Sequence, residues 1–219
     1  FPLTISLPPS GFGQSQPQFV LTVEQEPIPP IHHSLKILLD PIARRIRVED
    51  TISFPEELRA SSKTFELNNN LVISENSGSL QQLSNNVPEE NIGINAIGGL
   101  AAATDEYSLT LPANNNGQAF FAYSGSIYDL AEQSSPEYAQ SFSETSGIIG
   151  EQGVYLNHGS AWVPIFDNGL VTFDLEVEFA DTASTWKVVS QGDRNGENAW
   201  VSYDPMEEIY LIAANFTEY

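Results

Sequence analysis

Within residues 170–179, LVTFDLEVEF, apolar and polar side chains alternate strictly once Leu170 is set aside. The apolar positions run from Val171 to Phe179 at every second residue, and three acids occupy positions between them: Asp174, Glu176 and Glu178. A two-residue repeat is typical of a β-strand with one buried and one solvent-facing side. A row of carboxylates could bind a metal or act as an acid–base pair. Because charged side chains usually lie outside the core, a solvated face is the preferred interpretation.

The same type of pattern recurs along most of the chain. Segments rich in β-branched and aromatic residues, bounded by turn formers, predict further strands at 19–26, 32–40, 42–54, 63–68, 106–112, 118–128, 186–192, 199–203 and 208–219. Asp-Pro at 40–41, the Asn runs at 68–70 and 114–116, and Asn-Gly at 195–196 predict turns. One short helix could begin near Ser135 within the irregular segment 129–146. We therefore predict an all-β, β-sandwich-like fold of mostly antiparallel sheets.

Length and composition suggest one domain with its own core. The chain has 219 residues, of which 41% are hydrophobic, and no repeat or linker divides it. Residues 1–18 contain no charge and are rich in Pro, Gly, Ser and Gln, so we expect a flexible N-terminal tail exposed after processing. Residues 19–219 are then a single β-domain. This start favours an exported protein, periplasmic or at the cell surface, over a cytoplasmic one.

The charge balance excludes several classes of partner. There are 29 acidic and 8 basic residues, which give a net charge of −21. Nucleic acid and anionic membranes are poor partners, because binding them requires clustered Lys and Arg. No apolar run is long enough to span a bilayer. The absence of cysteine excludes disulfides, zinc–thiolate sites and thiol catalysis.

Motifs of catalysis and metal binding are missing. The sequence contains no H-E-x-x-H, C-x-x-C, phosphate-binding loop or G-x-S-x-G, so we predict no catalytic and no metal-binding residue in this chain. The adjacent His32 and His33 point to opposite faces of a strand and cannot both bind one ion without a bulge. Residues 192–198, GDRNGEN, resemble the start of a calcium loop, but a hairpin turn explains them better.

A weak candidate for a ligand-facing loop lies within residues 153–169. This irregular segment combines glycines, which permit close backbone approach, with polar and aromatic side chains. The candidate substrate-facing residues are Tyr155, Asn157, His158 and Trp162. The alternative for Trp162 and Phe166, which we favour, is packing against the core.

The order of several blocks resembles the N-terminal domain of zinc metallopeptidases of the aminopeptidase N type, or gluzincins. These blocks span roughly residues 30–219 and are HSLKILLDPIARRIRVEDTISF, GVYLNHGSAWVPIFDNGLVTFDLEVEF, WKVVSQGD and AWVSYDPMEEIYLIAANFTEY. The resemblance depends on their order more than on any one invariant motif.

This resemblance implies a saddle-shaped assembly of antiparallel sheets that packs on a separate catalytic domain and helps to shape its substrate cleft. That catalytic domain would hold the zinc through H-E-x-x-H and a downstream Glu, and would bind peptide through G-x-M-E-N. Neither motif occurs in these 219 residues. We therefore expect no cofactor and no hydrolysis in this chain alone, the catalytic domain as partner, and a peptide substrate at the domain edge.

One departure concerns the acidic or amide residue that family members place shortly before the proline block to hold the substrate's amino group. The corresponding stretch, YLNHGSAW, has no Glu or Gln, which puts strict aminopeptidase specificity in doubt. The alternative function is a free-standing cell-surface adhesion or carbohydrate-binding β-sandwich. It would use Trp162 or Trp200 as a sugar platform, and such a platform lies exposed to solvent.

Overall fold

The computed structural model describes residues 29–59, 62–87, 101–112, 115–130, 132–133, 143–167 and 169–216. The expected tail at 1–18, the predicted strand at 19–26 and the possible helix start near Ser135 lie outside these residues. Within them the all-β prediction is confirmed, because strands dominate and the sheets are mostly antiparallel. The helical turns in this part of the chain are 3₁₀ turns of three residues: η1 (Glu56–Leu58), η2 (His158–Ser160) and η3 (Asp181–Ala183).

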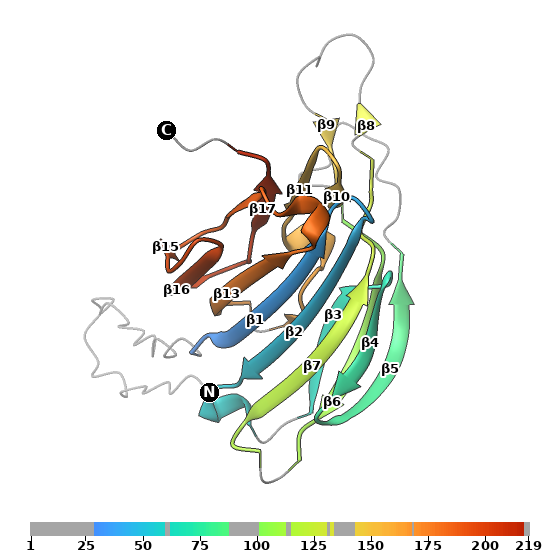
Figure 1. The fold of residues 1–219 in the computed structure, drawn as a ribbon. Coiled ribbons are helices and arrows are strands. Elements are labelled where there is room, and N and C mark those ends of the chain that lie inside the picture. The colour runs from blue at the N-terminus through green and yellow to red at the C-terminus, as the bar shows by residue number, and fades with distance from the viewer. Residues whose placement is uncertain are drawn as a thin grey trace, which may run out of the picture.

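A seven-stranded sheet forms the largest layer, and its long strands β13, β1, β2 and β7 run side by side across the molecule (Figure 1). Its strands, in spatial order, are β15 (Asp193–Arg194), β16 (Ala199–Met206), β13 (Val171–Phe179), β1 (Ile31–Asp40), β2 (Arg45–Ser53), β7 (Gln118–Gly125) and β4 (Leu71–Asn76). The pair β1 and β13 is parallel and the other neighbours are antiparallel. The sheet therefore joins strands that are far apart in the sequence.

Two four-stranded antiparallel sheets complete the fold. The first has the order β10 (Ile148–Gly150), β11 (Gly153–Leu156), β17 (Leu211–Ala214) and β14 (Lys187–Val189). The second has the order β12 (Ile165–Phe166), β3 (Lys63–Asn68), β6 (Thr104–Thr110) and β5 (Ser79–Asn86). A short pair, β8 (Glu132–Gln133) and β9 (Ser143–Glu144), is separate from both.

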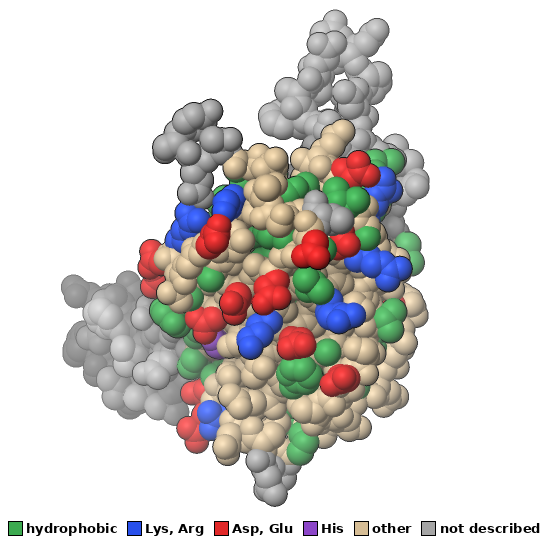
Figure 2. Space-filling view, in the orientation of Figure 1, with side chains coloured by type: hydrophobic (Ala, Val, Ile, Leu, Met, Phe, Trp, Pro, Cys, Tyr) green, Lys and Arg blue, Asp and Glu red, His purple; other side chains and the backbone are tan. Residues whose placement is uncertain are grey.

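In β13 the apolar residues face the core and the two glutamates face solvent, as the alternation predicts. Phe173, Leu175 and Val177 are buried, whereas Glu176 and Glu178 are exposed. Acidic and basic side chains are interspersed over this outer face (Figure 2). The register places Lys36 of β1 opposite Glu176, so cross-strand charges of opposite sign alternate across the sheet. The solvated-face interpretation of the acids thus agrees with their position.

The buried apolar side chains form one core cluster, to which the inner face of the seven-stranded sheet and both four-stranded sheets contribute. The Phe65 ring of β3 packs edge-on against Phe121 of β7, with 5.4 Å between ring centroids. The same ring lies 5.3 Å from Phe166 of β12, which itself meets Phe54 at 5.2 Å. These contacts are typical aromatic geometries and bury large apolar areas. The candidate loop at 155–162 is attached to this packed interior.

Candidate functional site

The candidate loop turns sharply directly after β11. Asn157 is the N-cap of η2, with extended backbone angles (φ −142°, ψ −169°). Its Oδ1 accepts a hydrogen bond from the Ser160 N–H at 3.2 Å, and the Ser160 Oγ accepts one from the Asn157 N–H at 3.1 Å. This reciprocal capping box satisfies backbone donors at the start of the turn. The sequence NHGS therefore encodes its own local turn.

Other parts of the chain hold the loop in place. The buried Asn68, at the end of β3, donates its side-chain N–H to the Ser160 carbonyl at 2.8 Å and its backbone N–H to the Ala161 carbonyl at 2.9 Å. Ala102 donates its N–H to the Gly159 carbonyl at 2.7 Å. Ala161 is in the left-handed region (φ 45°, ψ 42°), which is unfavourable for a residue with a Cβ. The surrounding hydrogen bonds compensate for this local strain.

A carboxylate from the far end of the chain reaches the loop. Glu208 precedes β17, and its Oε2 accepts a hydrogen bond from the His158 backbone N–H at 2.9 Å. Its Oε1 accepts one from the Tyr210 hydroxyl at 2.6 Å. That hydrogen bond is the largest of the effects that raise the pKa of Tyr210 to about 12. An acid that is distant in sequence thus contacts the backbone of the stretch YLNHGSAW.

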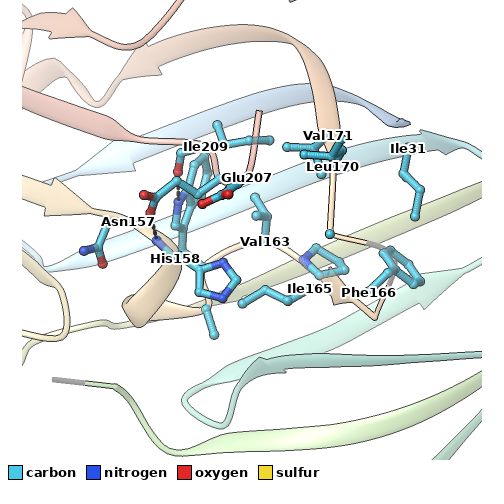
Figure 3. Close-up of a pocket in the computed structure, with 15 residues that line it drawn as sticks. Ile31, Asn157, His158, Val163, Ile165, Phe166, Leu170, Val171, Glu207 and Ile209 are labelled. Atoms are coloured by element: carbon cyan, nitrogen blue, oxygen red, sulfur yellow. Dashed lines mark hydrogen bonds between the residues drawn. The ribbon is translucent and has the colours of Figure 1, made fainter. Parts of the chain in front are cut away.

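His158 lines two hollows in the surface, of which Figure 3 shows the first. The first is a narrow groove of about 60 Å³. Its lining is mainly apolar, with polar groups at one end: Ile31, Val163, Ile165, Leu170 and Val171, then Asn157, Glu207 and Glu208. The second hollow, of about 220 Å³, has a more polar lining that includes Glu66, Asn86 and Thr104. The loop therefore presents an imidazole ring to two depressions, of which the second is the more polar.

The structure brings three of the four predicted site residues to one surface. The Asn157 amide donates to the Tyr155 hydroxyl at 3.3 Å, and His158 is exposed beside them. Trp162 differs, because its side chain is completely buried and its Nε1–H donates to the Ile209 carbonyl at 3.0 Å. This position gives Trp162 a packing role beneath the groove. The buried Phe166 likewise packs against the core.

Glu66, Glu207 and Glu208 were not predicted as site residues. No local pattern singles them out, since each is an ordinary acid in or beside a strand. Their proximity to His158 arises from the pairing of β11 with β17 and of β3 with β12. In the part of the chain that the structure describes, no cluster of three metal-ligating His, Cys, Asp or Glu side chains occurs. The loop can offer hydrogen bonds, negative charge and apolar contact to a ligand.

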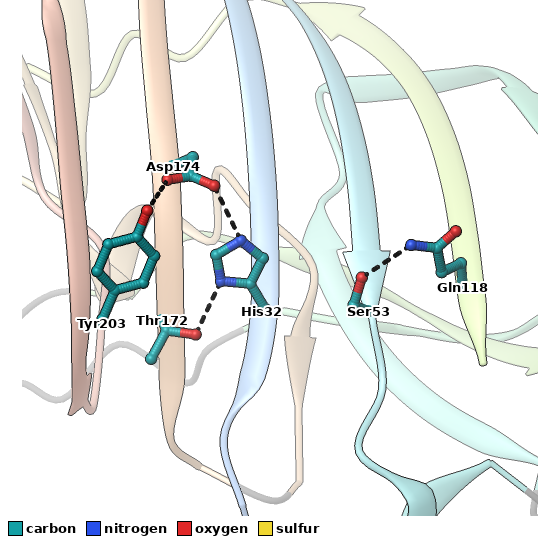
Figure 4. A network of polar contacts seen from close by, with 6 residues as sticks. All are labelled: His32, Ser53, Gln118, Thr172, Asp174 and Tyr203. Carbon is teal, nitrogen blue, oxygen red and sulfur yellow. Dashed lines mark hydrogen bonds and ion pairs between the residues drawn. The ribbon is translucent and has the colours of Figure 1, made fainter. Parts of the chain in front are cut away.

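A second polar network lies on the outer face of the seven-stranded sheet (Figure 4). The ring nitrogens of His32 contact the Thr172 hydroxyl at 2.9 Å and the Asp174 carboxylate at 3.1 Å. The exposed Tyr203 hydroxyl donates to the same carboxylate at 3.3 Å. His33, in contrast, is buried on the inner face. The two histidines therefore point to opposite faces as predicted, and they cannot bind one ion together.

The segment 192–198 forms the turn of a hairpin between β15 and β16. The Asn195 N–H donates to the Ala199 carbonyl at 2.8 Å, and the Arg194 Nε–H donates to the Gly196 carbonyl at 2.9 Å. Glu197 forms an ion pair with Lys187, which lowers the pKa of the Glu197 carboxyl. The predicted Asn-Gly turn is therefore present, and this acid is paired with a protein cation.

Comparisons with known proteins give likenesses of structure only. No protein-family model matches the sequence, and no curated protein matches it. The M1 zinc metallopeptidase of Deinococcus radiodurans, solved as a mutant bound to a Tyr-Ser-Ala substrate, is similar with a TM-score of 0.50 and 12% identity. That match covers 86% of this chain and 43% of the other.

Two further similar structures are larger proteins. Native yeast LTA4 hydrolase has a TM-score of 0.48 and 13% identity, over 84% of this chain and 28% of its own. An aminopeptidase N family protein from Idiomarina loihiensis has a TM-score of 0.45 and 12% identity, over 83% of this chain and 29% of its own. The chain thus spans less than half the length of these structures.

The class that these findings define is an all-β domain with a fold found in M1 zinc metallopeptidases. The likeness covers most of this chain and a minor part of the others, as expected for the N-terminal domain of such a protein. The resemblance seen in the order of the sequence blocks is confirmed as a likeness of fold. At 12% identity it establishes the fold and leaves activity to be proposed.

Proposed function

We propose that this chain is a non-catalytic β-domain of a zinc-metallopeptidase-like protein, in which it packs on a catalytic domain and shapes the substrate cleft. The observation that carries the proposal is the similarity to the D. radiodurans metallopeptidase, which covers 86% of this chain and 43% of that one. In that protein the matching fold belongs to a longer chain that was solved with a peptide substrate. Zinc and peptide chemistry would then belong to the partner domain.

The geometry around His158 supports a binding site that this chain forms only in part and that a second domain completes. Pockets that enclose a small molecule are commonly about 300–1,000 Å³. The apolar groove beside His158 has about 60 Å³, which is too small to enclose an amino-acid side chain and backbone. Apolar lining with a polar end formed by Asn157, Glu207 and Glu208 suits a surface that a second domain completes. We place the cleft-facing edge at Tyr155, Asn157 and His158, with Glu208 as its acid.

The carbohydrate-binding alternative needs an exposed tryptophan platform. Trp162 is completely buried. Trp200 is partly buried against the core, and its Nε1–H donates to the Val188 carbonyl at 3.2 Å. Trp162 therefore cannot act as a platform and Trp200 is only partly exposed, which favours the metallopeptidase-like proposal. The described residues also contain no helix with the length and apolar character of a membrane span.

The decisive test combines genetics with enzymology. In the natural gene, the reading frame that encodes this chain should also encode H-E-x-x-H and G-x-M-E-N after Tyr219. A product containing both parts should hydrolyse peptides and retain zinc after dialysis. The 219-residue chain by itself should do neither. A natural gene without these motifs would overturn the proposal, and so would hydrolysis of an aminoacyl nitroanilide by the purified 219-residue chain.

The cleft-facing edge needs a separate test in the longer protein. Replacing His158 by Ala, or Glu208 by Gln, should raise KM for peptides several-fold, because these groups would contact bound peptide or position the loop. The matched controls are Glu178→Gln and Tyr203→Phe on the outer sheet face, which should leave KM unchanged. Equal effects at both surfaces would contradict the assignment of this edge.

A further inference from the structure

Three neighbouring strands place polar side chains inside the core of the seven-stranded sheet. His33 of β1, Asp50 of β2 and Tyr123 of β7 are all on the inner face, where the exposed fraction is 0%, 0% and 1% respectively. In the register, Asp50 lies opposite Leu35 and Phe121, while His33 lies opposite Ile52. Tyr123 lies opposite Val48, so Asp50 has His33 and Tyr123 as diagonal neighbours on its two sides.

These three residues are only partly paired with one another. The His33 Nδ1 and the Asp50 Oδ2 are 2.8 Å apart and form a hydrogen bond. Three atoms of the same residues have no hydrogen-bond partner within the protein: His33 Nε2, Asp50 Oδ1 and Tyr123 Oη. Buried polar atoms are nearly always paired, either with protein or with ordered water. Three unpaired atoms on adjacent strands therefore indicate a binding site for a small polar molecule.

We propose that this cluster binds an internal water molecule that bridges Asp50 Oδ1 and Tyr123 Oη. Water suits the available groups, because the carboxylate oxygen can only accept and the hydroxyl can both donate and accept. A buried water needs two to four polar partners, and this pair provides two. Because the Asp50 carboxylate only accepts, the His33 Nδ1 carries the ring proton in their hydrogen bond, and the Nε2 of the neutral ring is an acceptor.

The chemistry of the cluster favours water over a cation. Burial, and then the negative charge of Asp50, raise the pKa of Tyr123 well above its ordinary value of 10. The Tyr123 hydroxyl therefore keeps its proton at neutral pH and acts as a neutral partner. A metal ion would need several negatively charged or imidazole ligands, and no group of three such side chains occurs among the described residues.

Bridging water would also fix the strand register. A shift of one residue in β1 or β2 would turn His33 or Asp50 outward and bring an apolar face into solvent. The water would pair two of the three unpaired buried atoms in the native register only, and leaving a buried polar group unpaired is costly. The proposed water would thus stabilise the native pairing of the sheet. This role does not depend on a catalytic partner domain.

The first test counts long-lived internal waters by ¹⁷O magnetic relaxation dispersion on the purified chain. Tyr123→Phe should lower the count by at least one, because it removes one of the two bridged groups. The matched control is Tyr203→Phe, which removes a hydroxyl from a mostly exposed tyrosine and should leave the count unchanged. An unchanged count in folded Tyr123→Phe would overturn the proposal.

The second test needs no variant and applies even if Tyr123→Phe fails to fold. A crystal structure of the wild-type chain should show an ordered water within hydrogen-bond distance of both Asp50 Oδ1 and Tyr123 Oη. A direct hydrogen bond between these two atoms, with no water beside them, would overturn the proposal. The absence of any ordered water within hydrogen-bond distance of both atoms would do the same.

Discussion

Glu208 accepts hydrogen bonds from the His158 backbone, 50 positions earlier, and from the nearby Tyr210. This carboxylate thus links the candidate loop to the segment before β17. Because this carboxylate raises the pKa of Tyr210, the titration of that tyrosine can be used to follow the site by absorbance. Burial contributes less than the hydrogen bond to the raised pKa of this half-buried tyrosine.

We expect Glu208→Gln to lower the pKa of Tyr210 from about 12 towards its ordinary value of 10, because the carboxylate that stabilises the neutral hydroxyl is removed. Absorbance at alkaline pH, which reports tyrosinate, measures this change. The pKa in the folded state exceeds that in the unfolded state. The stabilising contribution is therefore complete below pH 10 and lost as the pH rises through about 12. Glu207→Gln is the control, and an equal shift there would contradict the assignment.

Ala161 provides a second prediction at the residue scale. Its left-handed conformation costs about 1 kcal/mol for a residue with a Cβ, and glycine would remove this cost. Ala161→Gly should therefore be less destabilising, by about 1 kcal/mol, than Ala183→Gly in η3. Ala183 is a matched control because it is equally buried and has no positive φ. Urea unfolding of both variants measures the difference, and equal losses would refute the argument.

At the scale of elements, the strands that carry the clearest alternation were predicted almost residue by residue. Predicted 63–68 coincides with β3, and predicted 170–179 differs from β13 by one residue. Strands β4 and β5 were missed because both are edge strands whose side chains are mostly exposed, so neither shows an apolar repeat. Strands β10 to β12 have two to four residues, which is too short for a period to appear.

The buried side of β13 should carry most of its contribution to stability. Phe173→Ala should lower the free energy of unfolding by about 3–5 kcal/mol, because it removes a completely buried ring and leaves a cavity. Glu178→Ala, on the exposed face of the same strand, should change it by less than about 0.5 kcal/mol. Denaturant unfolding measures both. Comparable losses would show that the outer face is packed against something in the protein.

At the scale of the whole molecule, the net charge of −21 dominates the long-range electrostatics. Like charges repel in the compact state, and salt screens this repulsion over a distance of about 10 Å at 0.1 M. Solubility benefits from the same charge. The predicted single domain over 19–219 stays a prediction, since part of that range lies outside the described residues.

Raising NaCl from about 10 mM to about 500 mM should stabilise the chain by roughly 1 kcal/mol and raise Tm by about 2–4 °C. Differential scanning calorimetry measures this shift. KCl should act equally, because screening depends on ionic strength and not on the identity of the cation. A rise in Tm with calcium alone, at constant ionic strength, would contradict this explanation and indicate a specific cation site such as GDRNGEN.

The site was less predictable than the fold. Asn157 and His158 stay predictions as site residues, but their turn is a local feature, since capping bonds within four residues close it. The roles of Glu208 and Asn68 could not be read from the sequence, because both reach the loop through strand pairing over long sequence separations. Trp162 was also a candidate site residue, and its complete burial agrees with the favoured interpretation that it packs against the core.

The sequence by itself determined the all-β class, most long strands and the solvated side of β13, because a two-residue repeat is a local property of each strand. Only the tertiary structure decided which strands are neighbours, and hence that Glu208 meets His158 and that His33, Asp50 and Tyr123 share one buried cluster. Contacts of this kind, between residues distant in sequence, depend on sheet order and register. Order and register arise from the packing of the whole chain and leave no local signal in the sequence.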